Sequence, residues 1–176
     1  PACGPASGRP RLRRRRAGRA LGKPATPPLP SRARDWKRAP ARMGFAGFSA
    51  GSAMARSVVA ASGPGMADAP VLLDRVSSRP DYVVMVYSAG RATSAEQLKD
   101  FPPTYLFSAA WDRGAANGSA QLFMDLNKAG AVAELHIYQK GRHGFGAATT
   151  SPEFGPWMGE LQHFLKVGGF LTGGKQ

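Results

Sequence analysis

Short apolar runs alternate with longer amphipathic stretches along most of the chain. The runs at 42–48 and 104–110 read as buried strands, and the run at 81–88 is apolar on both faces, as in a parallel sheet. The run at 131–139 alternates apolar and polar positions, which predicts a strand with one wetter face, as at a sheet edge. We therefore expect four strands.

Helices are expected between and after these strands. The segment at 50–62 is a helix with an unusually small face, and the segment at 117–130 is amphipathic with a glycine as its stop. A last helix is expected at 156–166, where the apolar residues recur on one side. Strands that alternate with helices predict an α/β fold with a mostly parallel sheet flanked by helices.

The amino-terminal part of the chain differs from the rest in composition. Of the net charge of +13, residues 1–42 carry +12 and residues 43–176 carry +1. Residues 1–30 are rich in Arg and Pro and lack apolar periodicity, so we expect a disordered leader. The folded domain is expected over 31–176, beginning with a short helix at 31–39. Because the charge belongs to the leader and not to a folded face, nucleic-acid binding is not expected.

The apolar runs are too short for a membrane span, which needs roughly 18 residues. No unbroken apolar stretch follows the arginine run as it would in a signal peptide. This pattern favours a cytoplasmic protein without a membrane partner and leaves open secretion of a longer parent protein. The single cysteine, Cys3, excludes a disulfide within the chain. No cluster has metal-ligand spacing, so we expect no metal and no cofactor.

Three polar residues follow three of the predicted strands. Ser49 lies between Gly47 and Gly51 after the first strand, Asp112 follows the third, and His143 follows the fourth. Loops at the carboxyl ends of parallel strands converge on one edge of the sheet, where these side chains could meet. A serine nucleophile needs a base, and an imidazole base needs a carboxylate that fixes its tautomer. The spacing G-x-S-x-G and the order Ser, Asp, His predict a nucleophile elbow and a triad.

The predicted elbow also accounts for the glycines and supplies a hydrogen-bond donor. A sharp strand-to-helix turn crowds the positions two before and two after Ser49, so we expect only small residues to fit at Gly47 and Gly51. The helix that begins at Ala50 presents backbone N–H groups, and we expect the Ala50 amide to stabilise an oxyanion. Aromatic residues near the site are candidates for substrate binding, with core packing as the alternative: Phe48, Trp111 and Phe145.

Each predicted catalytic residue has a structural alternative. Ser49 could be a small residue at a tight helix start, and Asp112 could cap the helix that follows it. Asp125 is a weaker candidate for the triad acid. His143 is bracketed by glycines, where a packing role is not expected.

The other two histidines are not expected to act in catalysis. His136 shares a strand face with Glu134, and we interpret the two as an ordinary surface pair. His163 lies away from the apolar side of the last predicted helix, so we expect it to be solvated.

Five segments, in this order, resemble the carboxy-terminal half of α/β-hydrolase esterases: RMGFAGFSAG, RPDYVVMVY, PPTYLFSAAWD, LNKAGAVAELHIYQKGRHGFG and a closing W…L…FL…GGFL. The most similar group is acetylxylan- and feruloyl-esterase-like, is related to dienelactone hydrolases and hormone-sensitive lipases, and is often labelled xylanase. The resemblance covers residues 31–171 approximately. It implies Ser49 as nucleophile, Asp112 as orienting acid and His143 as base.

The chain also departs from the pattern of this family. Family members begin with further strands and a His-Gly-Gly-type oxyanion loop, and residues 1–42 resemble neither. The resemblance therefore implies a truncated sheet of about four strands, whose open edge could support a homo-oligomer. Ser52 stands where a further glycine is usual, a change expected to be mild. Trp111 stands where an acidic residue often precedes the triad acid.

Together these features predict a serine esterase that acts through an acyl-enzyme. The resemblance implies acetyl, feruloyl or other short-chain esters, including those of plant polysaccharides, as substrates. A xylan-active glycoside hydrolase is one alternative, although it needs two flanking carboxylates and the sequence offers no recognisable pair. A catalytically inert fragment that acts only by binding is the other alternative.

Overall fold

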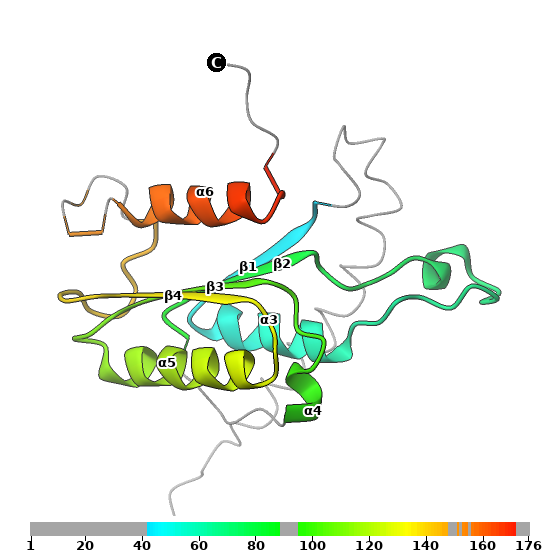
Figure 1. Ribbon diagram of the computed structural model, residues 1–176, viewed down its shortest axis with the longest axis horizontal. Coiled ribbons are helices and arrows are strands. Elements are labelled where there is room, and N and C mark those ends of the chain that lie inside the picture. Colours follow the sequence, from blue (N-terminus) through cyan, green and yellow to red (C-terminus); the bar gives the residue numbers. More distant parts are fainter. Residues whose placement is uncertain (1–41, 89–94, 148–150, 152, 155, 172–176) are drawn as a thin grey trace, which may run out of the picture.

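The computed structural model describes residues 42–88, 95–147, 151, 153, 154 and 156–171. The predicted leader at 1–30 and the short helix at 31–39 lie outside these residues. In the described part, one sheet lies between two layers of helices (Figure 1). Its strands are β1 (Gly44–Phe48), β2 (Tyr82–Val86), β3 (Thr104–Ala109) and β4 (Ala133–Tyr138).

All the strand pairs are parallel, and the strand order is β1-β2-β3-β4. This confirms the predicted α/β fold and its parallel sheet. Every residue of β3 is buried, whereas β4 lies at an edge, as predicted, and its side chains are mostly half-buried. The predicted wetter face of β4 is not observed, because the exposed residue of this strand is Ile137, on the face expected to be apolar. The prediction that β1 is a buried strand is wrong for the described residues. Strand β1 forms the other edge of the sheet, pairs only with β2 among the described strands, and is mostly exposed.

Helices cover the two faces of the sheet unequally. Helices α3 (Ala50–Ala61), α4 (Ala95–Leu98) and α5 (Arg113–Lys128) lie on one face, and α6 (Trp157–Val167) lies on the other (Figure 1). A short 3-10 helix, η1 (Leu72–Arg75), lies in the connection between α3 and β2. Buried apolar side chains fill both interfaces, so the sheet has a separate core on each side. No helix in the described ranges is long and apolar enough to cross a membrane.

Helix α5 begins at Arg113, earlier than the predicted start at residue 117. The first turn contains Gly114, a poor helix former, which weakened the helical signal before residue 117. A carboxylate at the N-cap compensates: Oδ1 of Asp112 accepts a hydrogen bond from the Ala115 N–H at 3.3 Å. Residues 115 and 116 are also buried, so tertiary packing supports this first turn.

Because the strands are parallel, their carboxyl ends lie along one edge of the sheet. Phe48 pairs with Val86 at the end of β1 and β2, and Ala109 pairs with Tyr138 at the end of β3 and β4. The segments that follow β1, β3 and β4 therefore leave the sheet from the same edge, and these segments carry the predicted site.

Candidate active site

Ser49 lies at a sharp turn between β1 and α3. It is the N-cap residue of α3, with φ 54° and ψ −117°, in a region that L-residues rarely adopt. Such a conformation costs about 1–3 kcal/mol and persists only where the surrounding structure maintains it. The Ser49 N–H donates to the carbonyl oxygen of Val86 at 3.0 Å, which ties the turn to β2. The Ser49 side chain makes no capping hydrogen bond, so its hydroxyl is left for another partner.

Only one of the two flanking glycines is crowded by the turn. A Cβ atom at Gly47 would lie 2.4 Å from the carbonyl oxygen of Gly51, so no larger residue fits there without movement of the backbone. A Cβ atom at Gly51 would meet nothing within 4 Å. The expectation that both positions require small residues is therefore correct for Gly47 and wrong for Gly51, because position 51 faces open space.

Ser52 ties the first turn of α3 to the ends of two strands. Its side chain is fully buried, and its hydroxyl lies 2.7 Å from the carbonyl oxygen of Gly47 and 3.0 Å from that of Val86. One hydroxyl hydrogen is shared between these two acceptors. The sequence marked Ser52 only as a departure from a family pattern, whereas the structure gives it a specific contact on each side of the turn.

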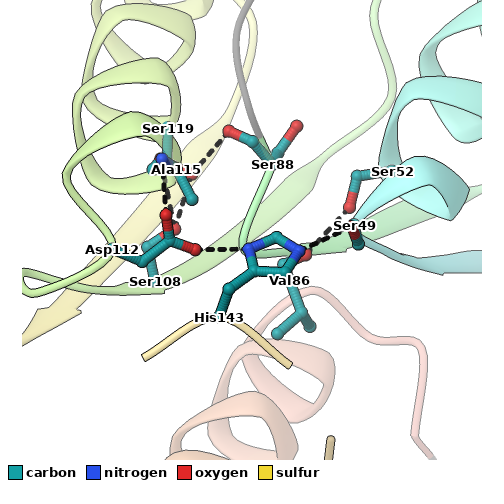
Figure 2. A network of polar contacts seen from close by, with 9 residues as sticks. All are labelled: Ser49, Ser52, Val86, Ser88, Ser108, Asp112, Ala115, Ser119 and His143. Carbon is teal, nitrogen blue, oxygen red and sulfur yellow. Dashed lines mark hydrogen bonds and ion pairs between the residues drawn. The ribbon is translucent and has the colours of Figure 1, made fainter. Parts of the chain in front are cut away.

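His143 lies between Ser49 and Asp112 (Figure 2). Its Nε2 atom is 2.6 Å from the Ser49 hydroxyl oxygen, and its Nδ1 atom contacts Oδ2 of Asp112. An ionised carboxylate can only accept, so Nδ1 carries the ring proton and Nε2 accepts from the serine hydroxyl. The structure thus brings together the three side chains that the sequence predicted, in the arrangement that general-base activation of a serine requires.

The backbone around His143 depends on glycines. Gly141, Gly144 and Gly146 all have positive φ, at 123°, 90° and 60°. A Cβ atom at Gly141 would lie 2.2 Å from the ring of Phe154, so this glycine also permits close packing of the loop. The His143 side chain remains 48% exposed, which leaves one side of the site open to solvent.

Asp112 makes both of the contacts that the sequence presented as alternatives. Its Oδ1 atom caps α5 through the Ala115 N–H, and its Oδ2 atom contacts Nδ1 of His143 (Figure 2). Asp125, the other candidate acid, is engaged within α5, where it accepts from the side-chain amide of Gln121 at 2.8 Å. The structure therefore brings Asp112, and not Asp125, to the histidine.

The three aromatic candidates for substrate binding have different environments. Trp111 is 61% exposed and immediately precedes Asp112. Phe48 is 38% exposed, and its ring contacts those of Tyr87 and Trp157. Phe145 is half-buried, and it stacks on a buried phenylalanine, with ring centroids 4.5 Å apart. Of the three, Trp111 and Phe48 present the most ring surface to solvent.

His136 pairs with Glu134, as predicted, but the pair belongs to a half-buried cluster and not to an open surface. Its Nε2 atom lies 2.7 Å from Glu134, its Nδ1 atom lies 3.2 Å from Glu160 of α6, and its ring stacks on buried Tyr105. Helix α6 covers this part of β4, which the strand pattern alone did not indicate. Burial, reinforced by Glu160, raises the pKa of Tyr138 to about 12.

His163 is exposed on α6, as predicted from its place on the helix. Within the described ranges, no group of three His, Cys, Asp or Glu side chains is arranged to hold a metal ion.

Sequence reasoning missed Tyr87, which directly follows β2. It is 5% exposed, and its ring centroid lies 4.7 Å from that of His143. A tyrosine at the end of a continuous apolar run looks like any core residue, so the sequence held no signal for this contact. Its unusual backbone, with φ 40°, is visible only in the structure.

Several solved structures that are similar to this chain are esterases or related hydrolases. An acetyl ester-xyloside bifunctional hydrolase from Caldicellulosiruptor lactoaceticus is 25% identical, with a TM-score of 0.77 over 88% of this chain and 66% of that one. An esterase from Thermogutta terrifontis is 18% identical, with a TM-score of 0.68 over 89% and 67%. The carboxylesterase Cest-2923 from Lactobacillus plantarum is 18% identical, with a TM-score of 0.67 over 90% and 70%.

These likenesses show the fold of the α/β-hydrolase esterases, which the resemblance in the sequence implied. The chain spans about two thirds of the length of these proteins. No protein-family model matches the chain, and a search of curated proteins gives no significant match.

Proposed function

We propose that this chain, which has the fold of the α/β-hydrolase esterases, is a serine carboxylesterase that acts through an acyl-enzyme. The proposal rests on one observation above all. The Ser49 hydroxyl lies 2.6 Å from Nε2 of His143, while Asp112 occupies the other nitrogen of the same ring. A proton can pass from the hydroxyl to the imidazole over that distance.

In the proposed acylation step, the Ser49 oxygen attacks the ester carbonyl as its proton moves to Nε2 of His143. Asp112 holds the imidazole in the tautomer that accepts this proton and stabilises the imidazolium that forms. The imidazolium then gives the proton to the alkoxy oxygen of the substrate. The alcohol leaves, and the acyl group remains bonded to Ser49.

In the proposed deacylation step, water takes the place of the alcohol. His143 removes a proton from the water as the oxygen attacks the acyl carbon, and it then returns a proton to Ser49 as the acid leaves. The backbone N–H of Ala50 is the proposed oxyanion donor in both steps. The N–H groups in the first turn of a helix have no acceptor within the helix, so this donor is available to the substrate.

The proposed substrates are acetyl, feruloyl or other short-chain esters, including those carried by plant polysaccharides. One similar structure is described as an acetyl ester-xyloside bifunctional hydrolase, which supports a small acyl group and a sugar-containing substrate. Exposed Trp111 and partly exposed Phe48 lie next to the proposed acid and nucleophile, so their rings are available to a sugar or an aryl group.

Hydrolysis of a xyloside is a second candidate, favoured only by the description of that similar structure. A glycosidase needs two carboxylates with the scissile bond between them. Glu134 and Glu160 approach each other in the described part of the chain, but the ring of His136 lies between them and contacts both. The histidine occupies the space that a glycosidic bond would need, so we rank this function second.

The decisive test is labelling by a fluorophosphonate, which reacts with activated serines. We expect one adduct per chain, mapped to the peptide that contains Ser49, and release of p-nitrophenol from p-nitrophenyl acetate. Ser49→Ala should lose both, because the nucleophile is gone. Ser57→Ala is the matched control, since this hydroxyl donates to a helix carbonyl of α3 at 3.0 Å and lies outside the site.

Other outcomes point to the alternatives. Hydrolysis that survives Ser49→Ala unchanged would exclude the triad. Release of reducing sugar from unsubstituted xylan that survives this substitution would favour the glycosidase. A folded chain that neither reacts with the probe nor releases p-nitrophenol would favour the inert, binding-only protein.

A further inference from the structure

Tyr87 interrupts the alternation of side chains along β2. Val83 and Met85 belong to the core on the side of α3 and α5, whereas Val84 and Val86 belong to the core on the side of α6. Regular alternation would place Tyr87 with the first pair. It lies instead in the same core as Val84 and Val86, because its positive φ of 40° turns the chain at this residue.

The strained backbones at Ser49 and Tyr87 converge on one side chain. In the described part of the chain, these are the two non-glycine residues with positive φ. They follow the adjacent strands β1 and β2, and both contact His143: the serine hydroxyl at Nε2, and the tyrosine ring at an interplanar angle of 58°. Strained residues cluster at functional sites when the strain serves a purpose. Their convergence indicates that Tyr87, like Ser49, is placed to act on the imidazole.

Two hydrogen bonds alone do not fix the orientation of the His143 ring. The contacts to Ser49 and Asp112 hold Nε2 and Nδ1, but torsion about the Cα–Cβ and Cβ–Cγ bonds of His143 can still rotate the ring out of line with both partners. Such a rotation would tilt the lone pair of Nε2 away from the serine proton. The tyrosine ring lies against the imidazole, so it blocks this rotation from one side, while the other side faces solvent.

The ring of Tyr87 is itself braced by aromatic neighbours. Phe145 meets it edge to face with centroids 4.8 Å apart, and Phe48 meets it at 5.8 Å. Phe145 follows His143 closely in the same loop, so its packing also draws that loop toward the sheet. The tyrosine is therefore a rigid support and not a loosely held surface ring.

We propose that Tyr87 is a positioning residue that fixes the plane of the His143 imidazole through its ring. The effect of Tyr87 on the reaction rests on the proposed esterase function, but the contact between Tyr87 and His143 can be measured without turnover. Because the support comes from the aromatic ring and not from the hydroxyl, Tyr87→Phe should preserve it. Tyr87→Leu and Tyr87→Met fill much of the same space without a flat ring, so they should remove the support.

The first measurement is the NMR resonance of the proton shared between Nδ1 of His143 and Asp112 in the full chain. We expect a sharp, slowly exchanging signal in the unaltered protein and in Tyr87→Phe. In Tyr87→Leu and Tyr87→Met we expect the signal to broaden or vanish. Phe164→Leu is the matched control, since Phe164 is buried in the same core but contacts Tyr105 and Phe170 instead of the site.

The second measurement is the rate at which a fluorophosphonate labels Ser49, together with kcat and KM for p-nitrophenyl acetate. Small misplacements of a catalytic group cost about 100-fold. We expect the leucine and methionine variants to react about 10- to 100-fold more slowly, with KM nearly unchanged, and Tyr87→Phe to stay within about twofold. Circular dichroism selects the temperature at which every variant is folded.

The proposal is wrong if Tyr87→Leu or Tyr87→Met keeps both the proton signal and the labelling rate. It is also wrong if Tyr87→Phe loses as much as they do, because the hydroxyl would then be the active part. If the unaltered protein is not labelled at all, the esterase function fails, while the proton signal still decides whether Tyr87 holds the ring.

Discussion

Two strand-to-helix turns each carry one residue of the candidate site, and the N-cap residue behaves differently in the two turns. Ser49 is the N-cap of α3 and follows β1 directly, whereas Asp112 is the N-cap of α5 and follows β3 after two further residues. Ser49 has positive φ, and its hydroxyl does not cap the helix. Asp112 has an ordinary φ of −86°, and its carboxylate does cap.

The difference lies in which partners each side chain reaches from its N-cap position. The Ser49 hydroxyl keeps free lone pairs when it donates to His143, but at this backbone conformation it makes no hydrogen bond to α3, and the backbone strain that presents it adds to the cost. A carboxylate has two oxygens, so Asp112 contacts His143 with one and caps α5 with the other. At the first turn, the proposed activity opposes stability. At the second turn, one residue serves both.

The largest effect is expected at Ser49. Comparison of Ser49→Gly with Ser49→Ala separates the loss of the hydroxyl, which both share, from the relief of backbone strain, which only glycine gives. Both substitutions should lower kcat for p-nitrophenyl acetate by about 10⁶-fold, as in other serine triads. Glycine adopts positive φ without strain, so Ser49→Gly should be more stable than Ser49→Ala by about 1 kcal/mol. Urea denaturation of the two variants measures the free energy of unfolding.

Equal stability of these two variants would contradict the claim that the turn is strained. The control is the same pair at Ser57, inside α3, where the helix should reverse the order. Ser57→Gly is expected to be less stable than Ser57→Ala by about 1 kcal/mol, since position 57 lies inside the helix and requires no positive φ.

The next effect tests the double role of Asp112. Asparagine caps helices as well as aspartate does, but it cannot stabilise the imidazolium or hold the correct tautomer. Asp112→Asn should therefore lower kcat by about 10⁴-fold and leave the melting temperature nearly unchanged. Asp112→Ala should lose the cap as well, which costs about 1 kcal/mol, or about 3 °C.

Differential scanning calorimetry and the p-nitrophenyl acetate assay on the same two samples decide this point. If Asp112→Asn lowers kcat less than tenfold, the carboxylate acts only as a cap. If both variants melt at the same temperature, the cap contributes nothing and the second turn resembles the first.

The sequence predicted those parts of the molecule that rest on local pattern. Apolar runs located the strands, and the G-x-S-x-G spacing located the first turn. The second turn was predicted less clearly, because Asp112 could be explained either as the triad acid or as a helix cap. A sequence cannot show that the two oxygens of one carboxylate face different partners. Tyr87 was missed for a related reason: β2 is apolar on both faces, so a residue that switches face leaves no trace in the pattern.

The same limit explains the error at Gly51. The glycine spacing on each side of Ser49 looks symmetrical in the sequence, but strand and helix approach the turn with different geometry. Position 47 faces the backbone of α3 across the turn, whereas position 51 faces outward. Only the path of the chain distinguishes the two.

The smallest predicted effect tests how sharp the first turn is, with these two glycines as a matched pair. At Gly47, an added methyl group would lie 2.4 Å from the carbonyl oxygen of Gly51, so Gly47→Ala should lower the free energy of unfolding by about 1–3 kcal/mol. Gly51→Ala meets open space within α3 and should raise it by about 0.5–1 kcal/mol. Urea denaturation measures both. If Gly47→Ala and Gly51→Ala change the free energy of unfolding in the same direction, the turn at Ser49 is relaxed like the one at Asp112. If the two changes have opposite signs, the backbone of α3 lies close against β1 on one side of Ser49 only. A sharp turn that directs the Ser49 hydroxyl outward requires this asymmetry.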